Sequence, residues 1–388
     1  MALTTNHANN ELIKFKKEVA YDFYRANRLD PFTGEGGMSI ITRHTDLAAD
    51  GKEIRIPLVT NLTGNGVGAG TLTGNEEQID SYGFPMWADW ARNAVANNIN
   101  TEKESSFSIS STARALLRTW AKRVARDDLI DMMLSIPTAS VQANRLSAPG
   151  NRINGVTWSA ASASQKNAWT AANVDRVLFG NAISNYSATF STAVANVDNT
   201  NDKMTANVLS LAKEMAQNTG YSSGAYNGKP KITPWMIENS DEEYFVCFVG
   251  QRAMRDLRAD STMAAANRDA RARENNPEKS NPIFTGGALL WNGIIIKEIP
   301  EITQRLILSG VGASSIDVEP YFFCGLNSFA QAIGDGVTVS PRDETDYGFL
   351  KGVGVRTQYG VGKVAKSVSG SLVDWGCLTG FVAGVASA

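Results

Sequence analysis

The stretch STARALLRTWAKRVARDDLIDMMLSIP, residues 111–137, predicts a single long helix. Ser111 suits the N-cap position, and Pro137 suits a stop because proline cannot continue a helix. One face of this helix carries apolar residues at helical spacing, namely Ala113, Leu117, Trp120 and Val124. At 1.5 Å per residue, a helix over residues 111–136 would be roughly 35–40 Å long. Helices of globular domains average only about 11–12 residues, so this element is unusually long.

A second stripe of the same helix is basic. It is formed at i, i+4 spacing by Arg114, Arg118, Lys122 and Arg126. The ordinary interpretation is a solvated face. The alternative is a contact with another subunit, because arginine forks bind carboxylates well. Both interpretations stay open at this point.

Residues 49–105, which precede the helix, predict a long two-stranded excursion. Residues 52–59 (KEIRIPLV) alternate polar and apolar side chains as a strand with one buried face does, and Pro57 suits an edge position. A glycine-rich segment follows over residues 64–70 (GNGVGAG), and then GNEE at residues 74–77. The return arm is aromatic and carries Tyr82, Phe84, Met86, Trp87 and Trp90. Two strands with so flexible a tip are poorly stable alone, so the element needs a neighbour to lie on.

The rest of the chain predicts an α+β protein. Residues 1–48 suggest an arm with an amphipathic helix over 11–23, capped by Asn10 and followed by a break at 30–37. Residues 150–200, rich in Ala, Ser, Asn and Thr, indicate a loop-rich region with short helices around 174–183. The later expected elements are helices at 205–217 and 251–258, and strands at 244–249, 291–298, 321–324 and in the last forty residues.

Composition excludes several classes of function. The 388 residues carry a net charge of -2, which gives no long-range attraction for nucleic acid or an anionic membrane. Three scattered cysteines argue against a disulfide framework and for a reducing compartment. No signal peptide and no membrane span are expected, so folding should take place in a cytoplasm. His7 and His44 are the only histidines, which removes most familiar catalytic constellations.

Four motifs suggest chemistry but lack the context that the chemistry needs. Residues 64–69 (GNGVGA) match the dinucleotide fingerprint, yet no helix is predicted after them. Residues 220–224 (GYSSG) match the hydrolase elbow, yet no histidine follows Ser222. Residues 360–363 (GVGK) fall short of a phosphate loop. Asp343, Glu344 and Asp346 form a cluster that more often is a solvated turn than a Ca²⁺ site. We therefore expect no catalytic residue, no cofactor and no metal.

Four stretches, in this order, resemble the major capsid proteins of tailed bacteriophages. They are IRIPL with GNEE (54–58, 74–77), YFVCF with DLRAD (244–248, 256–260), NPIFTGG with WNGIIIKE (281–287, 291–298), and LNSFAQA with DYG (326–332, 346–348). The likeness is strongest to the branch that includes the capsid protein of phage N-four, and it covers most of the chain. At Gly250 that family usually has proline, and we expect the change only to alter a turn.

The resemblance implies the Hong-Kong-97-type (HK97-like) capsid fold. It implies an N-terminal arm (1–48), an extended loop or E-loop (49–105), a peripheral domain (106–224) with the long spine helix at 111–136 and an insertion at 150–200, an axial domain (225–340), and a C-terminal part of the peripheral domain (341–388). The arm and loop would reach neighbouring subunits. The candidate inter-subunit contacts are Gly64, Gly66, Gly68, Gly70, Glu76, Glu77, Arg114, Arg118, Lys122 and Arg126.

The function implied is that of a structural subunit. Copies of the chain would form pentamers and hexamers, and then an icosahedral shell around double-stranded DNA that is contacted only through its backbone. Scaffolding, portal and cement proteins are the implied partners, and the virion, assembled in the host bacterial cytoplasm, is the implied location. Two alternatives remain: an encapsulin-like nanocompartment shell of the same fold, and, more remotely, a nucleotide- or metal-binding enzyme.

Overall fold

The computed structural model describes residues 27–37, 39–48, 53–64, 66–105, 108–139, 151–222, 225–236, 243–266, 288–342 and 349–387. These residues fall into two compact units. Unit 1 contains Trp90–Ala125 and Asp335–Gln358, and unit 2 contains Asn27–Asp89, Arg126–Gly334 and Tyr359–Ala388. The expected arm helix at 11–23 and the cluster of Asp343, Glu344 and Asp346 lie outside the described residues.

Unit 1 packs a long helix on a small sheet. Its elements are β5 (Asp89–Asn98), α1 (Ile99–Glu104), most of α2 (Ile109–Met133), and parts of β16 (Phe329–Pro341) and β17 (Leu350–Lys363). In this unit the paired strands follow the order β16-β17-β5, which is part of a five-stranded sheet that also includes β1 (Thr33–Gly34) and β2 (Ile41–His44). Leu117 and Ala121 of α2 are buried against Val353 and Val355 of β17. The i, i+4 spacing of the two α2 residues places them on one face of the helix, as the sequence predicts.

The long helix is confirmed, but both of its predicted ends are wrong. The helix begins at Ile109 and ends at Met133. The N–H of Ser111 donates to the Ser108 hydroxyl at 3.4 Å, so Ser111 lies inside the first turn. Pro137 does not close the helix, because Ile136–Pro137 forms strand β6 and pairs with β7 (Gly155–Val156). Over 25 residues the helix is about 37 Å long at the standard rise.

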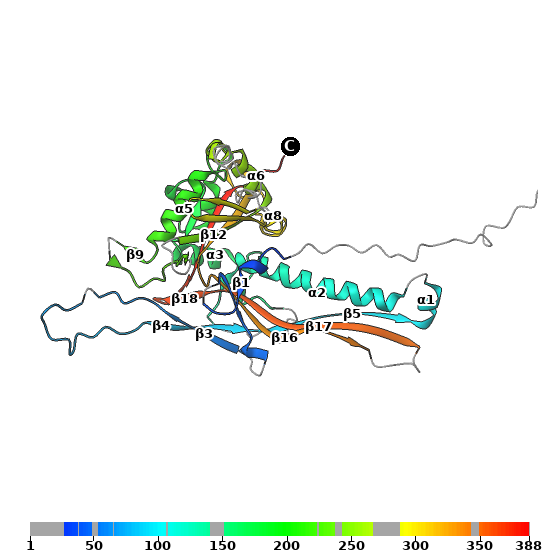
Figure 1. Cartoon of the computed structure of the whole chain (residues 1–388). Helices are drawn as coiled ribbons and strands as arrows, with labels where there is room; N and C mark the ends of the chain where they lie inside the picture. The colour runs from blue at the N-terminus through cyan, green and yellow to red at the C-terminus, as the bar shows by residue number, and fades with distance from the viewer. Residues whose placement is uncertain are drawn as a thin grey trace, which may run out of the picture. The chain divides into compact units, whose positions relative to one another are not determined.

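The main sheet of unit 2 has seven strands in the order β13-β14-β12-β15-β20-β8, with β11 (Trp235–Met236) also paired to β12. The strands on this path are β13 (Ala288–Trp291), β14 (Ile294–Glu298), β12 (Glu243–Val249), β15 (Val318–Cys324), β20 (Cys377–Ala383) and β8 (Val177–Phe179). The sheet lies among α5, α6 and α8 (Figure 1). Every residue of β15 and β20 is buried, which explains why both sequences are mostly apolar.

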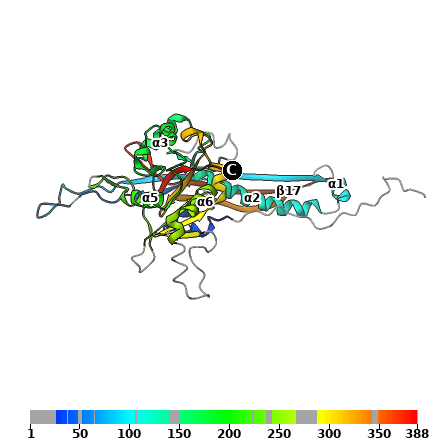
Figure 2. The ribbon, with the colours of Figure 1, turned by 90° about the horizontal axis from the view of Figure 1, so that it is seen from above.

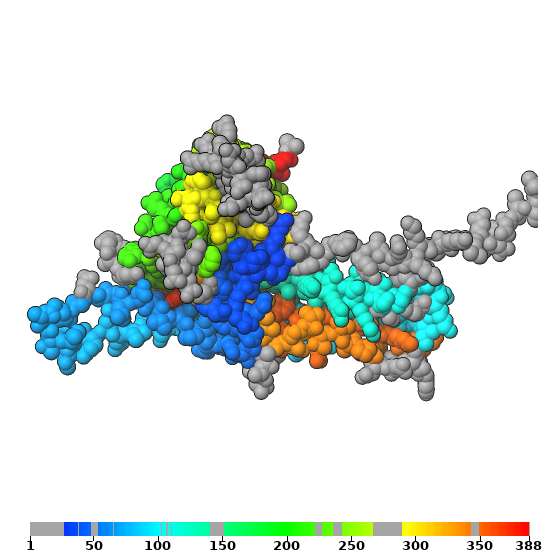
Figure 3. Space-filling view, viewed as in Figure 1, coloured from blue at the N-terminus to red at the C-terminus, as the bar shows by residue number. Residues whose placement is uncertain are grey.

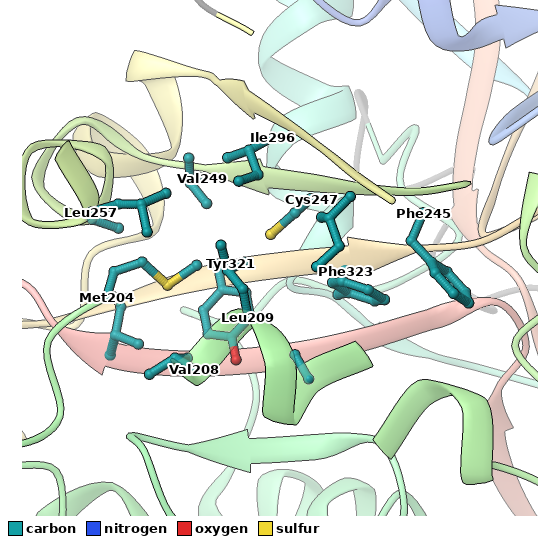
Figure 4. Packing of buried hydrophobic residues seen from close by; sticks show 14 of the residues in the cluster. Met204, Val208, Leu209, Phe245, Cys247, Val249, Leu257, Ile296, Tyr321 and Phe323 are labelled. Atoms are coloured by element: carbon teal, nitrogen blue, oxygen red, sulfur yellow. The ribbon is translucent and has the colours of Figure 1, made fainter. Parts of the chain in front are cut away.

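Two helices bury their apolar faces in the core of this sheet. They are α5 (Ala206–Asn218) and α6 (Gln251–Ala259), both close to their predicted ranges. Val208 and Leu209 of α5 meet Tyr321 and Phe323 of β15 in the cluster that Figure 4 shows. The hydroxyl of Thr205 caps α5 by accepting the N–H of Val208 at 3.4 Å. The predictions for these two helices are confirmed.

Residues 151–200 are more structured than the sequence predicts. They contain α3 (Ala163–Ala172), β8 and α4 (Phe190–Ala195), and β8 replaces the helix expected around 174–183. Phe179 of β8 stacks on Phe381 of β20 with ring centroids 5.2 Å apart, and Trp158 meets Phe190 edge to face at 4.7 Å. This aromatic cluster makes the segment part of the core of unit 2, and the expected short helices lie at α3 and α4 and not around 174–183.

Short elements complete unit 2. They are η2 (Asp30–Phe32), β1 (Thr33–Gly34), β2 (Ile41–His44), η3 (Asp46–Ala48), β3 (Glu53–Val59), β4 (Ser81–Trp87), η4 (Ile183–Asn185), β9 (Tyr221–Ser222), β10 (Ala225–Tyr226), α8 (Pro300–Leu306), η6 (Ala313–Ser315), β18 (Ala365–Val368) and β19 (Ser371–Asp374). The strand predicted at 291–298 is interrupted by a tight turn. Asn292 and Gly293 adopt positive φ values of 49° and 71° there, as two-residue hairpin turns require.

The described helices include none that is long and apolar enough to cross a membrane. Cys247, Cys324 and Cys377 are free thiols, and all three are buried in unit 2.

Candidate assembly surfaces

The predicted two-stranded excursion exists, and its base is packed on the core of unit 2. Strands β3 and β4 pair antiparallel from Glu53 opposite Trp87 to Val59 opposite Ser81. Phe84 and Met86 are fully buried, in a cluster that includes Ala330 and Val364. Trp90 lies beyond this hairpin, on β5 of unit 1. The base of the hairpin therefore packs on the core of its own chain. The segment that connects β3 to β4 extends beyond this packed base.

That segment, residues 60–80, is here called the extended loop. Figures 1 and 2 both show it projecting from the ends of β3 and β4, and no other part of unit 2 covers it on the face drawn in Figure 3. Three of its apolar side chains are widely exposed: Leu62 by 55%, Leu72 by 65% and Ile79 by 71%. Exposed apolar side chains gathered on one projecting element are typical of a protein–protein contact.

Two glutamates organise the tip of the extended loop. The Glu77 carboxylate accepts the N–H and the hydroxyl of Thr63, the latter at 2.8 Å, and the N–H of Gly64 at 2.8 Å. These hydrogen bonds lower the pKa of Glu77 below its ordinary value. Glu76 accepts the N–H of Gly74 at 2.7 Å. Both predicted contact residues thus hold the loop's own backbone, and a contact with another subunit stays a prediction.

At its base the extended loop is tied to β18. The ammonium of Lys366 donates to the hydroxyl of Thr60 at 2.7 Å and forms an ion pair with Asp80. The Thr60 N–H also donates to the Asp80 carbonyl at 3.2 Å. The Lys366 side chain is 0% exposed, whereas that of Asp80 is 66% exposed. The sequence analysis missed Lys366, because the strand Ala365–Val368 (AKSV) is too short and too polar to predict that its lysine is buried and needs a partner.

The four predicted basic residues of the spine helix are not equivalent. Arg114, Arg118 and Lys122 are exposed on the part of α2 that belongs to unit 1. Arg126 belongs to unit 2, and its side chain is only 12% exposed. Its guanidinium pairs with Asp127 at 2.8 Å and with Glu301 at 3.1 Å. The guanidinium of Arg126 is therefore paired with carboxylates of its own chain. Contacts of Arg114, Arg118 and Lys122 with a second subunit stay a prediction.

The acidic end of the spine helix is matched by arginines of unit 2. Arg305 of α8 bonds Asp131 with its Nη2 at 2.5 Å and Asp127 with its Nη1 at 3.3 Å. Arg152 donates to Asp128 at 2.6 Å and to the Tyr359 hydroxyl at 3.1 Å. These bonds raise the pKa of Arg152 and of Arg305 despite the opposing effect of burial. The network fixes the end of α2 within unit 2, so it is structural.

The motifs that suggested chemistry have structural positions instead. No helix follows the glycine-rich segment, because residues 71–80 contain only a turn at Thr73–Gly74 and irregular chain before β4. Ser222 lies in the two-residue strand β9. Lys363 is at the end of β17, fully buried, with its ammonium 2.5 Å from the Asp374 carboxylate. In the part of the chain that the structure describes, no three His, Cys, Asp or Glu side chains are grouped to hold a metal ion.

The comparisons with known proteins agree with the arrangement of hairpin, spine helix and sheet. The model of a family described as phage capsid protein matches residues 4–378. The chain belongs to this family. Because its members are structural proteins of phage capsids, the chain is the major capsid protein of a phage. No curated protein matches it.

Solved structures place the fold in the same class. The chain is similar to the capsid asymmetric unit of cyanophage Pam1, with 28% identity, a TM-score of 0.83 and complete coverage of both chains. It is also similar to the capsid of Ralstonia phage GP4, with 19% identity, a TM-score of 0.69 and coverage of 98% and 97%. The head of Helicobacter pylori bacteriophage KHP40 gives 12% identity, a TM-score of 0.64 and coverage of 98% and 99%. The fold of the major capsid protein is thus the α+β HK97-like fold.

Proposed function

We propose that copies of this capsid protein form pentamers and hexamers that close into an icosahedral shell around the double-stranded DNA of a tailed phage. The observation that carries the proposal is the extended loop, whose base is packed and tied within the chain while its apolar side chains Leu62, Leu72 and Ile79 are exposed. An ordered projection costs conformational entropy that exposed side chains do not recover. Burial against a neighbouring copy offsets that cost at about 25 cal/mol per Å² of apolar surface.

The division of the chain is part of the proposal. The arm (1–48) and the E-loop region (49–105) would contact neighbours, residues 106–224 and 341–388 would form the peripheral domain, and residues 225–340 would form the axial domain around five-fold and six-fold axes. Because β3 and β4 pack on the core, we assign the contacts of the E-loop region to its residues 60–80. The aromatic cluster of residues 151–200 supports their assignment to a folded part of the subunit.

The partners follow from the same role. Scaffolding, portal and cement proteins would take part in assembly in the cytoplasm of the host bacterium, and DNA would be contacted through its phosphates only. The net charge of -2 suits a shell, because strongly like-charged subunits repel one another when crowded.

Purified protein, with its scaffold where one is needed, should form closed shells visible by electron microscopy and light scattering. Replacing the exposed Leu72 and Ile79 by serine should reduce the yield of shells while the melting temperature stays unchanged. Leu116→Ser, also on an exposed apolar side chain (45%), is the matched control outside the loop. A protein that stays monomeric under every assembly condition would refute the proposal. Native particles that hold a protein cargo and no nuclease-protected DNA would indicate a nanocompartment instead.

A further inference from the structure

We propose that Lys366 is a positioning residue that holds both ends of the extended loop and thereby sets the direction in which the loop leaves the subunit. The proposal rests on the proposed function in one respect, since direction matters only if the loop meets a neighbouring copy. It assigns a role to an ion pair within one chain and adds no contact between subunits.

The first step is the placement of the ammonium. Lys366 lies on β18, where it pairs with Val373 of β19, and its neighbour Ala365 belongs to the cluster that buries Phe84 and Met86 of the hairpin. The side chain of Lys366 is 0% exposed. Its hydrogen bonds reach Thr60, the first residue after β3, and Asp80, the last residue before β4. One group in the core therefore contacts the loop at both of its ends.

The second step is the energy of a buried charge. An ammonium removed from water requires a counter-charge and hydrogen-bond acceptors, and removing one partner of such a pair is strongly destabilising. Asp80, the last residue of the loop, supplies the negative charge. Its side chain is 66% exposed, yet its carboxylate reaches the buried ammonium. A rotation of the loop about its base would pull Asp80 and Thr60 away from Lys366. The pair thus restrains the loop at the point where a small rotation moves the tip furthest.

The third step is a comparison within the chain. Lys363, three residues before Lys366, is also fully buried and also has an aspartate partner, Asp374. Its ammonium lies 3.1 Å from the Thr379 hydroxyl and 5.0 Å from the centre of the Trp169 ring. All of these groups belong to the core of unit 2, and none belongs to the loop. Lys363 therefore provides a control with the same chemistry and no connection to the loop.

The test compares Lys366→Met with Lys363→Met by hydrogen exchange and by assembly. Methionine fills the buried space, and Asp80, being exposed, can be solvated when its partner is gone. In Lys366→Met the amides on either side of the loop base should exchange about tenfold faster than in the wild type, with the rest of unit 2 unchanged. Shells should be fewer or irregular in diameter. Lys363→Met should lower the melting temperature and leave exchange at the loop base as in the wild type.

Asp80→Asn provides a second variant if Lys366→Met does not fold, because the asparagine oxygen can still accept a hydrogen bond from the Lys366 ammonium while the counter-charge is lost. Faster exchange at the loop base in either folded variant, with altered shells, supports the proposal. The proposal is overturned if a folded Lys366 or Asp80 variant exchanges its loop-base amides as slowly as the wild type. It is also overturned if such a variant forms shells of normal number and diameter. If the wild type itself forms no shells, the proposed function fails, whereas the exchange measurement still decides whether Lys366 holds the loop.

Discussion

At the residue scale, Gly250 shows how a single missing side chain makes a buried acid possible. A Cβ at this position would lie 2.2 Å from Oε1 of Glu319 and 2.5 Å from Oγ1 of Thr303. The Glu319 carboxylate is fully buried, accepts the N–H of Ala253 in the first turn of α6 at 2.5 Å, and accepts the hydroxyl of Thr303. Gly250 therefore does more than shape a turn, because its missing side chain leaves room for a buried carboxylate.

Gly250→Ala should lower the free energy of unfolding by about 1–3 kcal/mol, the usual cost of overpacking a core. The alanine Cβ would overlap the Glu319 carboxylate and the Thr303 hydroxyl, so these groups would have to shift and weaken the bonds of Glu319 to Ala253 and Thr303. Gly68→Ala is the control, because nothing lies within 4 Å of a Cβ built there. Urea denaturation of both variants measures the difference. Equal stability of the two would contradict the packing described around Glu319.

Glu319 also makes a prediction about pH. Burial raises its pKa above the ordinary value of 4.5, against the lowering effects of Thr303, Ala253 and Arg252. The folded state therefore binds a proton more tightly than the unfolded state does, so this group's contribution to stability is greatest below about pH 4.5 and is lost as pH rises through the raised pKa. The wild-type unfolding free energy minus that of Glu319→Gln should fall over this window and then level off. A difference that is constant with pH would refute the prediction.

At the scale of elements, the spine helix depends on one buried stripe. Leu117 is 2% exposed and packs with Val353 and Val355, whereas Leu116, the preceding residue, is 45% exposed. Leu117→Ala should destabilise the protein by about 2–4 kcal/mol, because it removes core contacts and leaves a cavity. Leu116→Ala should change the stability by less than about 0.5 kcal/mol. Thermal and urea unfolding distinguish the two, and similar losses for both would mean that the helix packs through another face.

Deleting residues 64–70 tests the extended loop as an element. The deletion removes exposed residues and one bond to Glu77, while β3, β4 and their buried side chains remain. The subunit should keep its circular dichroism spectrum and its melting temperature within a few degrees, yet its yield of shells should fall at least tenfold, because the tip would no longer reach a neighbour. A subunit unfolded by this deletion would show that the loop stabilises the monomer.

Elements with a clear period were predictable from the sequence, and those held by distant contacts were not. The spine helix, α5, α6, β12 and the β3–β4 hairpin follow from apolar spacing and strand alternation. Strand β8 does not, because its three residues lie in a segment without periodicity and become a strand only by pairing with β20. Lys366 escaped notice for a similar reason, since Asp80 lies 286 residues away in the chain.

At the scale of the whole molecule, the order of strands makes unit 2 depend on its last residues. Strand β20 lies between β15 and β8 and contributes Leu378, Phe381 and Val382 to the core. Removing residues 377–388 should abolish cooperative unfolding and leave the protein insoluble. Removing only 386–388 loses the bond between Arg255 and Ser387, and should cost no more than about 1 kcal/mol. A soluble, cooperatively folded product of the longer truncation would show that the sheet closes without β20.

The family and the fold class were predictable at this scale because short motifs occur along the chain in the family's order. The exposed or internal role of each charged side chain was not predictable. Arg126 and Arg114 look equivalent in the sequence, and only the positions of Asp127 and Glu301 make Arg126 internal. A stripe of like residues indicates a helix face, but whether part of that face is covered depends on segments far along the chain.

The position of β20 between β15 and β8 also has a consequence for timing during synthesis. A ribosome adds about 5–20 residues per second, so a chain of 388 residues takes roughly 20–80 s to make. Strand β8 ends about 200 residues before β20 begins, and β15 ends about 50 residues before it, so both are made well before the strand that lies between them. A nascent chain that has not yet made β20 therefore lacks the strand between β15 and β8 and cannot present a finished unit 2 to others translated from the same message.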